Sequence, residues 1–340
     1  MAQNQHYVPQ FILRQFLSNQ TKGQVTVYDK HDDRVFTTST KNVMAETKFN
    51  DFVLDEKWIA SFEPIASTIE SAIFPRYNTI LETQQLEKTP QERVDLSALI
   101  AFQAVRTKSH RERMREVENA IRGKVESLGG SMEDIEGWAP LTEDRLKQSH
   151  LSSVRDLMFT IVDCLVDKVF LLLKCKPGRS FYLGDNPVCL HNMKQYGPYG
   201  NLGFGVKGIE VYMPLSSNLL LAAWCPSVLE EATQALQEAE RGLEVSALDK
   251  LMKGEISHEQ MKSWLEHVKG EGVARPKSLL ACIERGTPID SDDDNMDFIN
   301  SMQTGYAHRY LVCQKGDFEL ARRFSHEFPE LKKGRKFVIS

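Results

Sequence analysis

Two long stretches without helix-breaking residues most constrain the fold of this chain. Thr89 and Pro90 form a helix start, with threonine as the N-cap and proline in the first turn, and no breaker follows until Gly123. At 1.5 Å per residue this helix would be about 45 Å long. A second helix is predicted over 143–175, and we expect its apolar face to pack against the first helix. That face consists of Leu151, Val154, Leu157, Met158, Ile161, Leu165, Val169 and Leu172.

Shorter segments around these helices predict a small sheet. Residues 24–29 and 35–38 are rich in β-favouring residues and flank a turn, so they predict a β-hairpin. The chain is therefore predicted to be α+β and predominantly helical, with two long antiparallel helices packed with a small, mainly antiparallel sheet. Further strands are predicted at 181–183, 209–213, 219–224 and 307–313, and further helices at 54–77, at 228–269 with breaks near Gly254 and Gly270, and at 298–302.

The length of 340 residues allows one large domain or two, and we favour a single domain over 1–340 with insertions. Its predicted parts are an N-terminal motif and β-hairpin (1–53), a helical core (54–176), a small sheet (177–226), a helical segment (227–285), and a C-terminal strand with a basic tail (286–340).

Composition and charge narrow the class of protein. A net charge of −5 and a pI near 6.0 argue against a surface that coats nucleic acid along its whole length. The six cysteines are scattered and include no CxxC pair, which is typical of buried free thiols in a reduced compartment. The polar N-terminus lacks the organisation of a secretory signal, and the apolar runs at 169–173 and 219–224 are far shorter than a membrane span of roughly 20 residues. We therefore expect a cytoplasmic protein without a membrane segment.

The opening segment carries the most unusual cluster of polar residues. His6 precedes a helix that starts with proline, and Gln10 and Arg14 lie one turn apart on a shared face of that helix. Apolar neighbours such as Phe11 and Phe16 can anchor this face while its polar groups stay accessible. The three polar side chains are therefore predicted to converge.

The HYVPQ motif at 6–10, followed by Arg14 and Phe16, resembles the opening of a bacterial family known only as a domain of unknown function. Gly184 stands where this family is expected to carry serine or threonine, which weakens any role for a hydroxyl there. The resemblance identifies relatives and supplies no mechanism. It extends to Tyr28-Asp29-Lys30, to the segment from Gln103 to Thr107, to the DNPV motif at 185–188, and to Asn300.

A second polar cluster is predicted on the first long helix. Gln103, Arg106 and His110 lie at i, i+3 and i+7, so one continuous helix would place them along one face. The alternative is a solvated helix face, because a charge-rich run follows at 108–115. The family resemblance, and not the spacing, favours Gln103 and Arg106 as functional residues.

The DNPV motif follows a predicted strand and offers a carboxylate and an amide at the strand end. Asp185 could orient His6, bind a divalent cation through oxygen, or accept backbone N–H groups, and an Asx-type turn with Asn186 is the structural alternative. Asn300 could place an amide in the same pocket or cap a helix.

Several familiar motifs do not support a specific activity. The sequence from Gly203 to Gly208 satisfies GxGxxG, yet it precedes a predicted strand instead of following one, which is atypical of a dinucleotide site. The sequence contains no GxSxG elbow, HExxH pair or P-loop. The basic tail, which includes Arg322, Arg335 and Lys336, can contact phosphate backbones or form solvated surface.

The leading hypothesis is an enzyme acting on an anionic, phosphate-containing substrate, nuclease-like or phosphodiesterase-like, with a role in phage defence. A divalent cation is a candidate cofactor, and nucleic acid or another anionic ligand a candidate partner. The alternatives are a non-catalytic nucleotide or anionic-ligand sensor, and a purely structural role in which both motifs lock the N-terminus to the sheet. The candidate catalytic residues are His6 and Asp185, and the candidate substrate-binding residues are Gln10, Arg14, Gln103, Arg106, Asn186 and Asn300.

Overall fold

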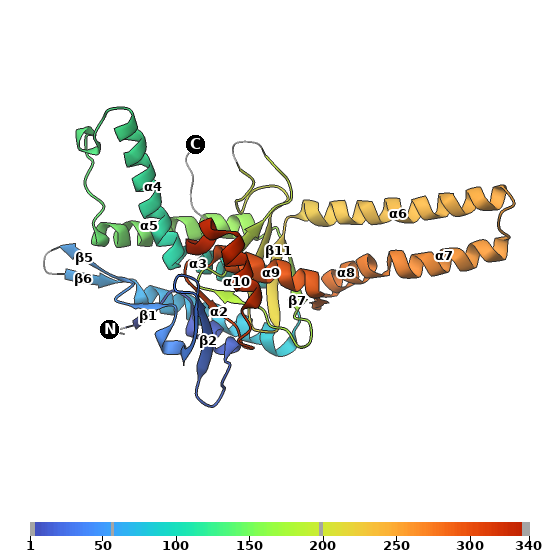
Figure 1. Cartoon of the computed structure of the whole chain (residues 1–340), viewed down its shortest axis with the longest axis horizontal. Helices are drawn as coiled ribbons and strands as arrows, with labels where there is room; N and C mark the ends of the chain where they lie inside the picture. The colour runs from blue at the N-terminus through green and yellow to red at the C-terminus, as the bar shows by residue number, and fades with distance from the viewer. Residues whose placement is uncertain (1–3, 56–57, 197–199, 335–340) are drawn as a thin grey trace.

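The computed structural model describes residues 4–55, 58–196 and 200–334 and has an α+β fold (Figure 1). Helices make up 53% of the chain, which confirms that it is predominantly helical. Figure 1 shows a body of helices and small sheets, from which α6 (Pro226–Met252) and α7 (His258–Gly272) extend as a long antiparallel pair. We call this pair the arm.

The largest sheet has five strands in the order β12-β7-β11-β10-β9, and only β12 and β7 pair in parallel. Its central strand β11 is apolar along most of its length because cores lie on both of its faces. Leu221 belongs to the main core, whereas its neighbour Leu220 belongs to a second core under α9. The strands are β7 (Val169–Lys174), β9 (Cys189–His191), β10 (Glu210–Pro214), β11 (Leu219–Trp224) and β12 (Ile289–Asp290).

A four-stranded sheet in the order β3-β2-β13-β8 joins the two ends of the chain. The predicted hairpin is confirmed as β2 (Gln24–Asp29) and β3 (Arg34–Ser39), and β2 pairs with β13 (Tyr310–Val312) near the C-terminus. The remaining strands are β8 (Leu183–Gly184), β1 (Asn4–His6) paired with β4 (Ala45–Thr47), and β5 (Asp51–Asp55) paired with β6 (Trp58–Ser61).

The first predicted long helix is wrong as a continuous element. It divides into α3 (Pro90–Val105) and α4 (Lys108–Ser127). Thr107 adopts an extended backbone, and its hydroxyl accepts a hydrogen bond from the backbone N–H of His110, so this threonine caps α4. His110 therefore does not continue the helical face of Gln103 and Arg106.

The second predicted long helix is also too long. Helix α5 (Glu143–Leu165) ends ten residues before the predicted terminus at Cys175, and the apolar run that follows forms β7. The apolar run is a strand because it pairs with β11. The sequence does not show this, since the periodicity of a short apolar run does not distinguish a strand from a buried helix. Helices α3 and α5 do pack together, but the predicted pair of long antiparallel helices is not confirmed.

The helix predicted over 54–77 begins later than expected. The β5–β6 hairpin occupies its first part, and α2 (Glu63–Thr83) starts with Pro64 in its first turn, where proline is well tolerated. Helix breaks lie near both predicted positions: α6 ends at Met252, two residues before Gly254, and α7 ends at Gly272, two residues after Gly270. The other helices are α1 (Gln10–Leu13), α8 (Ala274–Arg285), α9 (Asp293–Tyr306) and α10 (Glu319–Glu327).

Candidate functional site

The HYVPQ segment lies inside the body, where β1 leads into α1. The Nε2 atom of His6 is 2.9 Å from the backbone oxygen of Thr40. Since a carbonyl oxygen only accepts, Nε2 carries the proton and Nδ1 the lone pair. Burial lowers the pKa of His6 below its ordinary value, so the imidazole is neutral at neutral pH.

The end of α3 binds the backbone of this segment. Gln103 donates from Nε2 to the oxygen of Tyr7 at 3.0 Å, and Arg106 donates from Nη2 to the oxygen of His6 at 2.6 Å. The other amino group of Arg106 forms an ion pair with Glu70 of α2. Both predicted residues are thus buried, and they hydrogen-bond to the main chain of the HYVPQ segment, Arg106 at His6 and Gln103 at Tyr7.

Gln10 and Arg14 occupy a different position from these buried residues. Arg14 is exposed and donates from Nη2 to Oε1 of Gln10 at 3.3 Å, which is consistent with the predicted shared face. Among the described residues, no hydrogen bond connects Gln10 or Arg14 to Gln103 or Arg106. The structure therefore brings His6, Gln103 and Arg106 together and leaves Gln10 and Arg14 at the surface.

Asp185 is almost completely buried and accepts three backbone hydrogen bonds from successive residues. Its Oδ1 accepts from the N–H of His308 at 2.7 Å, and its Oδ2 accepts from those of Arg309 at 2.9 Å and Tyr310 at 3.1 Å. The carboxylate therefore fastens β8 to the start of β13.

Asn186 connects this clamp to the helix break. Its Oδ1 accepts from the hydroxyl of Thr107 at 3.2 Å, and its Nδ2 donates to the oxygen of Tyr306 at 3.3 Å. Residues 106–107 therefore contact the HYVPQ segment on one side and the DNPV motif on the other. We call this set of contacts, made by Gln103, Arg106, Thr107, Asp185 and Asn186, the polar lock.

Asn300 belongs to a separate set of contacts. It accepts from the N–H of Tyr182 at 2.8 Å and donates to the oxygen of Ser180 at 3.1 Å, so it holds α9 against the chain before β8. It neither caps a helix nor hydrogen-bonds to the polar lock.

Sequence reasoning missed the neighbouring Gln303. It accepts from the N–H of Gly184 at 2.9 Å and donates to the oxygen of Pro187 at 2.8 Å. A Cβ atom at Gly184 would lie only 3.2 Å from both the backbone oxygen and Oε1 of Gln303. The close approach of α9 therefore leaves little room for a side chain at this position.

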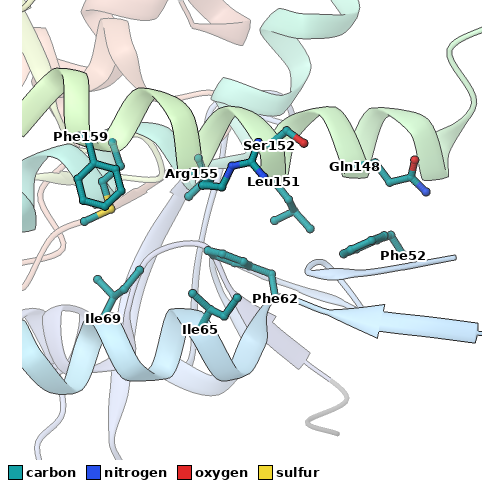
Figure 2. Close-up of a pocket in the computed structure, with 11 residues that line it drawn as sticks. Phe52, Phe62, Ile65, Ile69, Gln148, Leu151, Ser152, Arg155 and Phe159 are labelled. Atoms are coloured by element: carbon teal, nitrogen blue, oxygen red, sulfur yellow. The ribbon is translucent and has the colours of Figure 1, made fainter. Parts of the chain in front are cut away.

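An open apolar groove lies between α2, α5 and β5 and encloses about 580 Å³. Figure 2 shows Phe62, Ile65 and Ile69 on one wall, with Leu151 and Phe159 of α5 on the other. Ile65 of α2 is 55% exposed and Phe159 of α5 is 69% exposed, so apolar side chains of both helices are open to solvent at the groove. The apolar faces of these two helices are wider than their mutual contact covers, and the sequence carries no signal for that difference. Its full lining is Phe52, Phe62, Ile65, Ile69, Gln148, Leu151, Ser152, Val154, Arg155, Met158 and Phe159.

The polar lock also positions one wall of this groove. Arg106 binds Glu70 on α2, and Glu63 at the start of α2 accepts from the side-chain amide of Asn50 at 2.7 Å. Helix α3 in turn packs on both α2 and α5. The buried polar contacts and the groove are thus two parts of one arrangement.

The described residues also restrict other kinds of site. Within them, no group of three or more His, Cys, Asp or Glu side chains is placed to hold a metal ion. None of the helices in these parts of the chain combines the length and the apolar character needed to cross a bilayer. Lys332 and Lys333 of the predicted basic tail are described, whereas Arg335 and Lys336 lie outside the described residues.

Fold and site together define an α+β protein with an open apolar groove supported by a buried polar lock. A family model described as "Protein of unknown function (DUF4238)" matches residues 4–317, and the chain belongs to this family. The expected membership of a family known only as a domain of unknown function is thereby confirmed. No curated protein and no solved structure matches the chain.

Proposed function

We propose that this protein is a non-catalytic binding protein, and that its groove takes an amphipathic ligand with an apolar body and an anionic group. The observation that carries the proposal is the groove itself, with a volume of about 580 Å³ and walls of aromatic and aliphatic side chains. Small-molecule sites typically have volumes of about 300–1,000 Å³, with mainly apolar walls and a few polar groups that fix orientation.

The contacts of the predicted catalytic residues favour binding over catalysis. The Nε2–H of His6 donates to the backbone oxygen of Thr40, and Asp185 accepts hydrogen bonds from three backbone N–H groups. A general acid or base must reach the atoms of a substrate, directly or through one water molecule. Side chains committed to backbone groups of their own chain suit a scaffold better than such a role.

The rim of the groove supplies the positive charge for the anionic group. Arg155 lines the groove, and its side chain is 71% exposed and paired with the neighbouring Asp156. Exposed ion pairs of this kind contribute little to stability, so a ligand anion can displace Asp156 at little cost. Ser152 and Gln148 provide further polar groups along the same helix.

Two fluorescent probes with a similar ring system separate the apolar and anionic parts of the proposal. Anilinonaphthalene sulfonate is anionic, whereas N-phenyl-1-naphthylamine is neutral. We expect Ile65→Glu to weaken both probes at least about tenfold, since it places a charge inside an apolar site. Arg155→Ala should weaken only the anionic probe.

Leu128→Glu is the matched control, because Leu128 is an exposed leucine outside the groove. Circular dichroism of each variant establishes that the fold is intact before titration. If Ile65→Glu binds both probes as the unmodified protein does, the groove is not the binding site.

A further inference from the structure

The arm carries an apolar stripe near its tip. Val245, Leu248 and Met252 of α6 are 60%, 50% and 87% exposed. Their spacing of three and four residues places them on one face of the helix. Ala247, in contrast, is completely buried in the arm. The stripe is therefore an apolar helix face that α7 leaves uncovered.

We propose that this stripe docks into the groove of a second copy of the chain. This inference rests on the proposed binding role of the groove and names its partner. Apolar grooves recognise amphipathic helices through anchors on one helix face. Val245, Leu248 and Met252 occupy positions i, i+3 and i+7 of such a face. The groove offers the complementary surface of aromatic and aliphatic side chains.

The overall shape makes the partner a second molecule. Figure 1 shows β5 and α5, which border the groove, toward one end of the long axis, and the arm extends from the other. The tip of α6 therefore points away from the groove of its own chain. A contact between two different surfaces of identical chains joins them head to tail.

Charges beside the two surfaces match. Arg155 and Asp156 form an exposed ion pair at the groove, and Asp249 and Lys253 form another on α6, one turn apart and beside the stripe. On docking, Arg155 can pair with Asp249 of the second copy, and Asp156 with its Lys253. Two exposed pairs within chains are thereby exchanged for two pairs between chains, so no charge is left without a partner.

Sedimentation velocity over a wide range of protein concentration tests this inference. The unmodified chain should self-associate, and Leu248→Glu on the arm or Ile65→Glu in the groove should weaken association at least about tenfold. Met252→Glu is a second arm variant, chosen because its side chain is the most exposed of the stripe. Leu128→Glu should associate as the unmodified chain does.

Mixing the arm variant with the groove variant gives the decisive result. One intact arm and one intact groove remain, so an equimolar mixture of Leu248→Glu and Ile65→Glu should form a heterodimer and nothing larger. A mixture that stays monomeric overturns the inference, as does an unmodified chain that is monomeric at every concentration. Self-association that persists undiminished in Leu248→Glu also overturns it.

Probe binding distinguishes this failure from a failure of the proposed function. Leu248→Glu leaves the groove intact and should bind anilinonaphthalene sulfonate at least as tightly as the unmodified chain. Suppose that no association occurs, that Leu248→Glu binds the probe and that Ile65→Glu does not. The groove then binds ligands, but the arm is not its partner. If Ile65→Glu leaves probe binding unchanged, the proposed function itself fails.

Discussion

Replacing Asp185 by asparagine tests whether the DNPV motif is a structural clamp. The carboxylate accepts three backbone hydrogen bonds, two at Oδ2 and one at Oδ1. Asparagine keeps the shape but has one carbonyl oxygen and one NH₂ group, which is a donor. In either orientation of the amide, at least one backbone N–H loses its acceptor and faces another donor.

The structure sets the size of the expected effect. Hydrogen bonds to a charged group contribute about 1.5–3 kcal/mol each, and a buried donor without an acceptor costs about 1–3 kcal/mol. Asp185→Asn weakens one or two such bonds to neutral ones and leaves at least one donor unpaired. We expect the free energy of unfolding to fall by about 3–5 kcal/mol, as is typical when one partner of a buried charged contact is removed.

Urea unfolding followed by tryptophan fluorescence measures this difference. The midpoint should fall while the slope of free energy against urea stays constant, because the surface exposed on unfolding is unchanged. Asp134→Asn is the matched control: Asp134 is exposed, and its replacement should stay within about 0.5 kcal/mol. A loss below about 1 kcal/mol for Asp185→Asn would refute the clamp and reopen a chemical role for this carboxylate.

Two further predictions concern other buried groups. His150 accepts from Arg111 at Nδ1 and contacts the oxygen of Val105 through Nε2, and burial with the nearby Arg111 charge lowers its pKa to about 3. The unfolded state therefore binds one more proton at this site between about pH 6.5 and 3, so His150 alone should lower the unfolding free energy by about 2–3 kcal/mol between pH 7 and pH 4.5. His150→Gln should flatten this dependence by about one proton, and an unchanged slope would contradict the assignment. Lys30→Met should cost about 3 kcal/mol in urea unfolding, because the buried ammonium donates to three backbone oxygens; a loss within experimental error would show that these bonds contribute nothing.

Local patterns in the sequence determined many of the elements correctly. The β2–β3 hairpin, the strands β10 and β11, and the helices on either side of Gly254 all follow from alternation, helical spacing or a helix-breaking glycine. These signals depend on neighbours within a few residues, so no distant contact is needed to interpret them. The family resemblance favoured Gln103 and Arg106 as functional residues, and the structure places both at the backbone of the HYVPQ segment.

Contacts between distant segments decided the rest. Val169–Lys174 forms a strand because β11 lies beside it, and Thr107 ends one helix and begins another where its hydroxyl also reaches Asn186. The sequence could not show whether Gln103 and Arg106 donate hydrogen bonds to a ligand or to the backbone of the opening segment, because both interactions require the same donors. Nor could it reveal the groove, since helical periodicity marks an apolar face as one that needs a partner but does not show whether the fold supplies one. Only the tertiary structure shows that α2 and α5 leave such faces open at one end of the molecule and that α6 presents another on the arm.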